Sequence, residues 1–131
     1  MQETVILYNI GKSEAGKAII SLLKKLEVKV IIAKTKDLMN PIGYTLGLDG
    51  YEASQERIKE IPNDDMMVLY GFEPKQIQVL FQIFEQANIP FIPLKVEVNE
   101  TNVEWSLTKL IKGVKDEYMH LTGMNKDLGM L

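Results

Sequence analysis

The sequence predicts one α/β domain in which a four-stranded, mainly parallel sheet carries helices on both faces. Two observations lead to this class. Short apolar runs alternate with longer segments whose apolar residues recur at helical spacing, which is how strands and helices alternate along an α/β chain. A strand–helix–strand pattern also occurs twice, at 5–33 and at 66–98, so two βαβ-like units are expected.

The first unit begins with residues 5–10, a nearly unbroken apolar run that is typical of a strand buried on both faces. A helix is expected over 13–26, with Ser13 as its N-cap, because a serine hydroxyl accepts a hydrogen bond from the first helical turn. Its apolar residues share one face. They are Ile19, Leu22, Leu23 and Leu26. Residues 28–33 supply the second strand.

The second unit begins with the apolar run 66–72, which is expected to be the third strand. Pro74 opens the next helix, because proline suits the first helical position. A fourth strand is expected over 89–98. Its prolines, Pro90 and Pro93, place it at an edge of the sheet, since proline cannot donate to a strand ladder.

The last helix is expected over about 102–121, where apolar residues again share one face. The pattern Thr101-x-x-Glu104 is a plausible capping box for its start. We therefore expect the domain to cover 1–121 and residues 122–131 to form a C-terminal tail.

The two units match in sequence as well as in pattern. The stretch Leu7-Tyr8-Asn9-Ile10 matches Leu69-Tyr70-Gly71-Phe72. In the helices, Ile19, Leu22, Leu23 and Leu26 match Leu80, Ile83, Phe84 and Ala87, and in the strands after them Val28, Val30 and Ile31 match Ile89, Phe91 and Ile92. Two similar strand–helix–strand units are the simplest interpretation of this internal echo.

Two topologies fit these elements. One is a parallel sheet in the order 2-1-3-4 with helices on both faces, and the other is a ferredoxin-like split βαβ arrangement with all helices on one face. The connection 35–65 decides between them. It contains Asn40-Pro41, a good helix start, and a crossover helix there would let the third strand run parallel to the second. The central strands are apolar on both faces, which favours the first topology.

Composition limits the classes of partner. The net charge is −3 at pH 7 and no basic block occurs, so no nucleic-acid partner is expected. The chain has no cysteine, which excludes disulfides and thiolate chemistry. No apolar stretch reaches the length of roughly 18 residues that a membrane span needs, so no membrane partner is expected. The N-terminus does not resemble a signal peptide, and the expected location is cytoplasmic.

Residues 11–18 (GKSEAGKA) nearly match the phosphate-binding loop G-x-x-x-x-G-K-[ST]. The match fails at Ala18, where such a loop needs a hydroxyl to hold Mg²⁺. The expected third strand also has no acidic residue at its tip, although such enzymes need one for the metal. We interpret the stretch as a strand exit followed by a helix start, with Gly16 and Lys17 on a solvated first turn, and expect no nucleotide binding.

No complete catalytic or metal-binding set is recognisable. His120 is the only histidine, and it forms a single Glu-x-x-His pair with Glu117, whereas di-iron carboxylate sites need two such pairs. The run Asn63-Asp64-Asp65 is explained by turn chemistry before a strand. We therefore expect no catalytic residues, no metal site and no cofactor.

The segment 40–51 is unusual for a connection, with three glycines and two tyrosines. One interpretation is a small helix closed by glycine, with Tyr44 and Leu48 packed on the sheet. The alternative is a mobile lid or docking surface, because long loops often carry function.

Several of these stretches resemble a bacterial family known as domain of unknown function 3783. They are Leu69-Tyr70-Gly71-Phe72, Ile92-Pro93-Leu94-Lys95, Thr101-Asn102-x-x-Trp105-x-Leu107 and Pro41-Ile42-Gly43-Tyr44-x-Leu46-Gly47. The likeness extends to about Tyr118. This family carries no known activity, so the resemblance supports the domain boundaries and implies no reaction.

In the parallel arrangement, polar and aromatic residues gather at the carboxyl ends of the strands, where open parallel sheets bind ligands. The expected ligand-binding residues are Asn9, Tyr70, Gly71, Lys95, Thr101, Asn102 and Trp105. The alternative interpretation is structural. In it, Thr101 caps the last helix, Asn102 completes the turn before it, and Trp105 anchors that helix to the sheet.

Together these observations favour a small cytoplasmic binding or protein-interaction domain over a catalyst, because no complete catalytic set is present. The partner would be another protein or a second copy of the chain in a homodimer. The alternative is an enzyme or sensor that acts on a small anionic ligand at the carboxyl ends of the strands. That alternative requires Lys95 to lie beside Asn102 in one crevice.

Overall fold

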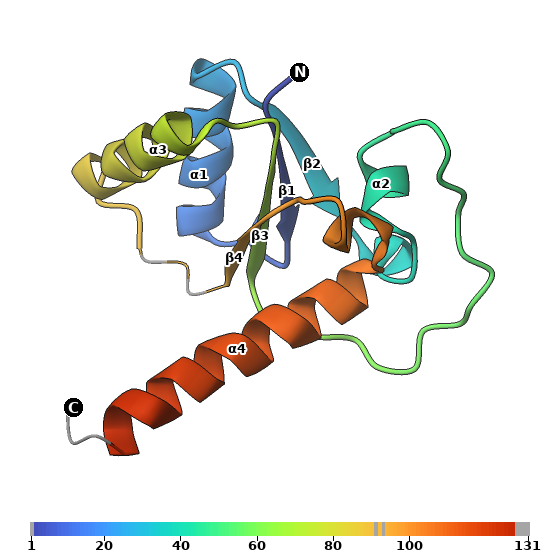
Figure 1. Ribbon diagram of the computed structural model, residues 1–131. Coiled ribbons are helices and arrows are strands. Elements are labelled where there is room, and N and C mark those ends of the chain that lie inside the picture. Colours follow the sequence, from blue (N-terminus) through green and yellow to red (C-terminus); the bar gives the residue numbers. More distant parts are fainter. Residues whose placement is uncertain (1, 91, 93, 128–131) are drawn as a thin grey trace.

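The computed structural model describes residues 2–90, 92 and 94–127. Its strands are β1 (Thr4–Tyr8), β2 (Lys29–Ala33), β3 (Met66–Tyr70) and β4 (Lys95–Glu97). Its helices are α1 (Glu14–Lys25), α2 (Ile42–Thr45), α3 (Pro74–Gln86) and α4 (Leu107–Asp127), with short 3-10 turns η1 (Thr35–Asp37) and η2 (Asn102–Glu104) (Figure 1). The strands form one sheet in the order β2-β1-β3-β4, which confirms the predicted class and strand order.

The sheet is mixed, and the prediction of a mainly parallel sheet is wrong at its centre. The pairs β1–β2 and β3–β4 are parallel, but β1 and β3 are antiparallel, with Thr4 opposite Tyr70 and Tyr8 opposite Met66. Two βαβ units therefore lie side by side and run in opposite directions. The ferredoxin-like alternative is also wrong, because helices cover both faces of the sheet (Figure 1).

The connection between β2 and β3 explains the antiparallel centre. Ala33 ends β2 opposite Tyr8, and Met66 begins β3 opposite the same residue, so the connection starts and finishes at one end of the sheet. Such a connection needs no crossover helix. The expected crossover is replaced by α2, which has four residues and then irregular chain (Figure 1). Gly47, at a φ of 78°, ends α2 in a Schellman motif, with the Leu48 N–H donating to the Gly43 carbonyl at 2.9 Å.

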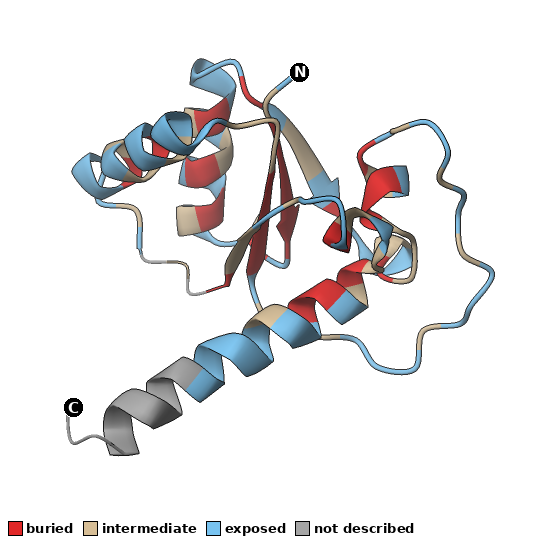
Figure 2. Cartoon of the chain, in the orientation of Figure 1, coloured by how far each residue is buried: buried red, intermediate tan, exposed pale blue. Residues whose placement is uncertain are grey.

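The core has two layers because both central strands are buried on both faces (Figure 2). On β1, Val5 and Leu7 pack with α1 and α3, whereas Ile6 and Tyr8 pack with α2 and α4. This alternation gives each face of the sheet its own helical cover. Over the described part of the chain, no helix combines the length and apolar character that a membrane span requires.

The internal echo predicted from sequence is present in the backbone. The residue after each central strand has a positive φ, 64° at Asn9 and 82° at Gly71. Both long helices of the units also end alike, with positive φ at Glu27 (61°) and Asn88 (58°). The next residue then donates to a carbonyl of the last turn at 3.0 Å in both units, Val28 to Leu23 and Ile89 to Phe84. Two similar units are thus confirmed at the level of helix caps.

The fourth strand and the last helix have different bounds from those predicted. The fourth strand has three residues instead of the predicted run 89–98, although it lies at an edge as predicted. The last helix begins at Leu107 and not near 102. Its first turn is capped by the Ser106 hydroxyl, which accepts from the Lys109 N–H at 3.1 Å, whereas Thr101 makes no side-chain cap. The helix continues to Asp127, beyond the expected boundary at 121, and 128–131 of the expected tail lie outside the described residues.

Gly16 has a packing role, which explains the resemblance to a phosphate-binding loop. Ser13 caps α1 as predicted, accepting from the Gly16 N–H at 2.9 Å. Gly16 is buried, contrary to the expectation of a solvated turn, because its Cα lies against the carbonyl oxygen of Ile10, and a Cβ there would overlap that oxygen. Lys17 is exposed and lies 3.6 Å from Glu14. The glycine that matches the motif is therefore required by the close approach of α1 to the Ile10 carbonyl, in the turn after β1.

Gly16→Ala should destabilise the protein by about 1–3 kcal/mol, because the new methyl group overlaps backbone atoms that cannot move independently. The matched control is Gly113→Ala in α4, where a Cβ would lie 3.7 Å from the Trp105 ring, an ordinary contact. That change should raise stability by about 0.5–1 kcal/mol, since it removes a helical glycine. Urea unfolding of both variants tests this, and equal effects would contradict it.

The Tyr8 side chain helps to attach the long connection to the sheet. The Tyr8 hydroxyl donates to the Pro62 carbonyl at 2.7 Å, and Tyr8 is 6% exposed. Burial, together with the nearby Asp64 carboxylate, raises the pKa of Tyr8 above its usual value. The folded state therefore holds the phenolic proton more tightly than the unfolded chain does, and the Tyr8 contribution to stability is lost as pH rises through the raised pKa.

Tyr8→Phe should lower the free energy of unfolding by about 1 kcal/mol at pH 7, because the Pro62 carbonyl loses its donor. The difference between wild type and variant should shrink above pH 10, the usual pKa of tyrosine, since the wild-type hydroxyl then ionises. Lysines titrate there too, but they are common to both proteins. Urea unfolding from neutral to alkaline pH measures the difference, and a constant difference would show that Tyr8 is not the titrating group.

Candidate functional site

The residues predicted to bind a ligand are not brought together at one site. Asn9 follows β1 at one end of the sheet, where its side-chain amide donates to the Asn63 carbonyl at 2.8 Å and to Asp65 at 3.0 Å. Tyr70 ends β3, and Gly71 follows it, at the opposite end of the sheet, because β1 and β3 are antiparallel. The predicted convergence at the carboxyl ends of all strands therefore does not occur.

Lys95 and Asn102 are also separated. Lys95 begins β4 opposite Met67, on the face covered by α3, and its ammonium lies 5.4 Å from the centre of the Phe81 ring. It donates to the Ile92 carbonyl at 2.6 Å, and burial lowers its pKa. It lines a cavity of about 430 Å³ with aromatic and aliphatic side chains, whereas Asn102 lines a different cavity beside α4. The crevice that the anionic-ligand alternative requires is therefore not formed by these two residues.

Thr101, Asn102 and Trp105 do line one cavity, of about 250 Å³, between β4, the loop after it and α4. The polar groups of Asn102, which is 4% exposed, are occupied by its own loop. Its amide donates to the Glu97 carbonyl at 2.9 Å, and its side-chain oxygen accepts from the Asn99 N–H at 2.8 Å. Asn102 thus holds the turn after β4, as the structural interpretation predicted.

Trp105 is half-buried and packs at the border of the α2/α4 layer. Its carbonyl accepts from the Ile42 N–H at 2.8 Å, which joins α2 to the segment before α4. The Lys109 ammonium lies 4.6 Å from the centre of its ring, a cation–π distance. Trp105 therefore anchors the start of α4, with part of its ring under a lysine instead of fully inside the core.

The segment 40–51 follows the structural interpretation in part. A short helix closed by glycine is present, and Leu48 packs against the core. Tyr44, however, is 43% exposed, so it does not pack on the sheet as expected. The ring of Tyr51 lies over Gly43, where a Cβ would come within 2.5 Å of it. Glycine at 43 thus allows the chain to fold back over α2.

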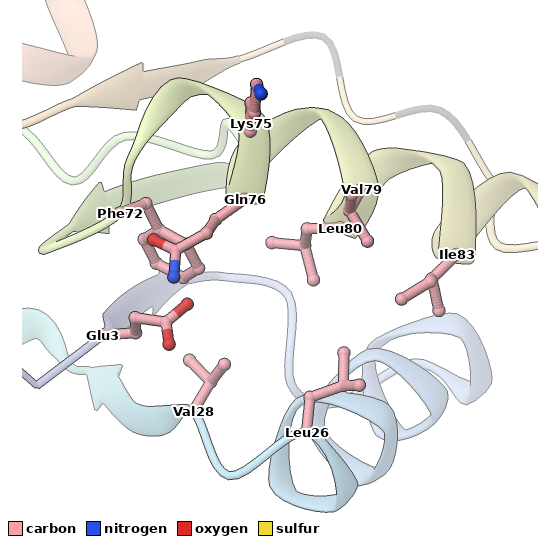
Figure 3. A pocket seen from close by; sticks show the side chains of 9 residues that line it. All are labelled: Glu3, Leu26, Val28, Phe72, Lys75, Gln76, Val79, Leu80 and Ile83. Carbon is pink, nitrogen blue, oxygen red and sulfur yellow. The ribbon is translucent and has the colours of Figure 1, made fainter.

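An apolar groove that sequence reasoning missed runs between α3 and the junction of α1 with β2 (Figure 3). We call it the α3 groove; its volume is about 280 Å³. Its floor includes Val28 and Leu80, which are nearly fully buried, and its walls include Leu26 and Val79, which are 38% and 51% exposed. The complete lining is Glu3, Leu26, Val28, Phe72, Lys75, Gln76, Val79, Leu80 and Ile83.

The exposed face of α3, beside this groove, carries few charges. Its outermost stripe has the spacing of a helix-packing seam and consists of Lys75, Val79, Gln82 and Gln86, all exposed. The charged residues exposed on α3 are Lys75 and Glu85. The exposed face of α4, by contrast, is dense in lysine and acid: Lys109, Lys112, Lys115, Asp116 and Glu117. A helical wheel of α3, with Val79 among glutamines, is the sequence signal that indicates this surface.

The remaining polar clusters offer less for chemistry. Within the described residues, no group of three or more histidine and acidic side chains is placed to hold a metal ion. Asp64 lies 3.4 Å from Lys115, which ties the connection before β3 to α4. His120 and Glu117 are exposed on α4.

Comparisons with known proteins return no match: no protein-family model, no curated protein and no solved structure is significantly similar to this chain. The site must therefore be judged on its own geometry.

Asn102→Ala should destabilise the protein by about 1–2 kcal/mol, because it leaves the Asn99 N–H and the Glu97 carbonyl, whose bonds to Asn102 are partly buried, without those partners. The control is the neighbouring Thr101→Ala; Thr101 is exposed and makes no cap bond, so its loss should change stability by less than about 0.5 kcal/mol. Thermal or urea unfolding checks both. If Asn102→Ala were neutral, its polar groups would be available to a ligand.

Proposed function

We propose that this chain is a protein-interaction domain that binds the apolar face of a helix at the α3 groove and the adjoining face of α3. The observation that carries the proposal is the combination of an exposed apolar groove with an almost uncharged helix face. Apolar residues that remain accessible in a continuous, hollowed surface mark interaction sites, and interface centres are depleted of charge.

The dimensions of the groove suit a helix. Leu26 and Val79 stand on its two sides, and Leu80, Val28 and Ile83 lie deeper between them (Figure 3). A helix presents apolar side chains at positions i, i+3, i+4 and i+7, and these fill such a furrow as anchors. The volume of about 280 Å³ corresponds to a few aliphatic side chains rather than to a cofactor.

A protein-interaction role fits the polar groups better than a role in catalysis. The polar groups of the Asn102 side chain are engaged by its own loop, and Lys95 lies on the face of the sheet that α3 covers. The resemblance to the family of unknown function adds no reaction to consider. An enzyme or sensor for a small anion therefore has less support than a binding domain.

The proposal predicts that peptides selected from a display library of amphipathic helices will bind the wild-type chain and lose at least about tenfold in affinity for Val79→Lys, because a charge then sits on the groove wall. Ile61→Lys is the matched control, since Ile61 is 58% exposed and lies in the connection beside α4. Both variants should fold normally. Selected peptides that bind Val79→Lys as tightly as wild type would overturn the proposal.

A further inference from the structure

We propose that β2 is a docking edge, which takes up an extended, acidic segment of another protein as a fifth strand of the sheet. This surface is separate from the α3 groove, so the inference goes beyond the proposed function. It rests on the backbone groups that β2 leaves open, on the side chains beside them and on the charge around the strand.

The two edges of the sheet differ in how far they are protected against further pairing. β4 has three residues, and the sequence before it contains Pro90 and Pro93. Short edge strands and prolines are common means by which proteins prevent another strand from adding to a sheet. β2 has five residues, with three β-branched residues in a row and neither proline nor glycine. β2 therefore has the length and composition of a strand that can accept a partner strand.

The outward backbone groups of β2 are open. The pairing of β2 with β1 begins at the Lys29 N–H, which donates to the Glu3 carbonyl at 3.0 Å. Alternate residues of a strand bond to the same neighbour, so the first, third and fifth residues of β2 face β1, and Val30 and Ile32 face away from it. Within the described part of the chain, no group bonds to the backbone N–H or carbonyl of Val30 or Ile32. Their two donors and two acceptors have the spacing that an extended chain requires.

The side chains at the same positions are accessible. β2 is exposed or half-buried except at Ala33, as Figure 2 shows. Val30 packs against the α1/α3 layer and is half-buried, and Ile32, on the same face, is 42% exposed. Apolar side chains of an added strand would lie beside Val30 and Ile32 and remove the exposed part of Ile32 from water. The bound segment is therefore expected to have apolar residues at alternate positions.

Lysines surround β2, although the net charge of the chain is negative. Among the described residues, none of these lysines forms an ion pair. Residues 24–36 contain one acid, Glu27, and five exposed lysines: Lys24, Lys25, Lys29, Lys34 and Lys36. The next acid along the chain, Asp37, accepts a hydrogen bond from the Lys34 backbone N–H at 2.8 Å. An acidic segment would therefore meet positive charge at both ends of β2.

The same lysines disfavour a second copy of the chain as the occupant of this edge. A β2–β2 pair between two copies would bring two lysine-rich segments together, and like charges oppose that pairing. An acidic strand converts the same charges into attraction. The edge is thus protected against its own kind and open to an acidic partner, which is a combination that gives specificity.

The probe for this site is a capped peptide in which glutamate and valine alternate, and its matched control has lysine in place of glutamate. At saturation, the acidic peptide should slow hydrogen exchange of the Val30 and Ile32 amides of the full chain at least about tenfold, because both amides then donate to the peptide. The lysine peptide should leave both rates unchanged. Amide exchange followed by NMR measures each rate. Exchange rates that stay the same at millimolar acidic peptide would overturn the inference.

Two variants test the backbone and the charge separately. Ile32→Pro removes one outward donor and keeps the ladder to β1, since proline is tolerated on the solvent side of an edge strand. It should weaken binding of the acidic peptide at least about tenfold, with an unfolding midpoint near that of wild type. K29E/K34E changes only exposed side chains, and it should weaken binding of the acidic peptide and allow the lysine peptide to bind. This second variant decides the matter if Ile32→Pro does not fold, and tight binding of the acidic peptide to it would overturn the inference.

The variant Val79→Lys separates this inference from the proposed function. Because Val79 lies on α3, its replacement should leave protection of the Val30 and Ile32 amides unchanged. If helices bind the α3 groove but the acidic peptide does not protect these amides, the β2 inference fails and the proposed function stands. The reverse result removes the proposed function alone. Self-association of wild type that Ile32→Pro abolishes would show that a second copy occupies β2, and it would overturn the inference.

Discussion

The antiparallel pairing of β1 with β3 is the constraint on which the rest of this structure depends. A right-handed βαβ unit places its helix on a fixed side of its strands. Two such units joined antiparallel are related by a twofold axis perpendicular to the sheet, so α1 and α3 must lie on the same face. Had the central strands been parallel in the same order, the two helices would lie on opposite faces. The groove between them exists only because of the strand direction.

The same pairing determines how the other face is covered. With both crossover helices on one side, Ile6, Tyr8, Met66 and Val68 need cover from elsewhere, and α2, η2 and α4 supply it. The long connection can stay at one end of the sheet, where Asn9 and Tyr8 hold it through hydrogen bonds to 62–65. Helices therefore cover both faces as the sequence predicted, but by a different route from the one expected.

The sequence predicts elements well here because their signals are local. Ser13 caps α1, Pro74 opens α3, and the matched tyrosines Tyr8 and Tyr70 precede matched turns. Strand direction is not local. The apolar runs of β1 and β3 are buried on both faces in either topology, so their residues do not indicate the direction of β3.

The predicted ligand site depended on the direction of β3. Because β3 runs antiparallel to β1, Asn9 lies at one end of the sheet, and Tyr70 and the Asn102 loop lie at the other end. The part of the site prediction that the structure confirms is local: Asn102 completes the turn after β4.

The helices α3 and α4, which cover opposite faces of the sheet, differ in the side chains that they expose to water. The proposed function rests on this difference. From Lys109 to Glu117, the exposed face of α4 carries mainly charged side chains over a closed apolar layer, and only further along do Tyr118 and Met119 lie exposed. The exposed face of α3 instead carries glutamines and a valine in place of most charges. The exposed face of α3, with Val79 among glutamines beside an apolar groove, is therefore the surface on which the proposed interaction rests.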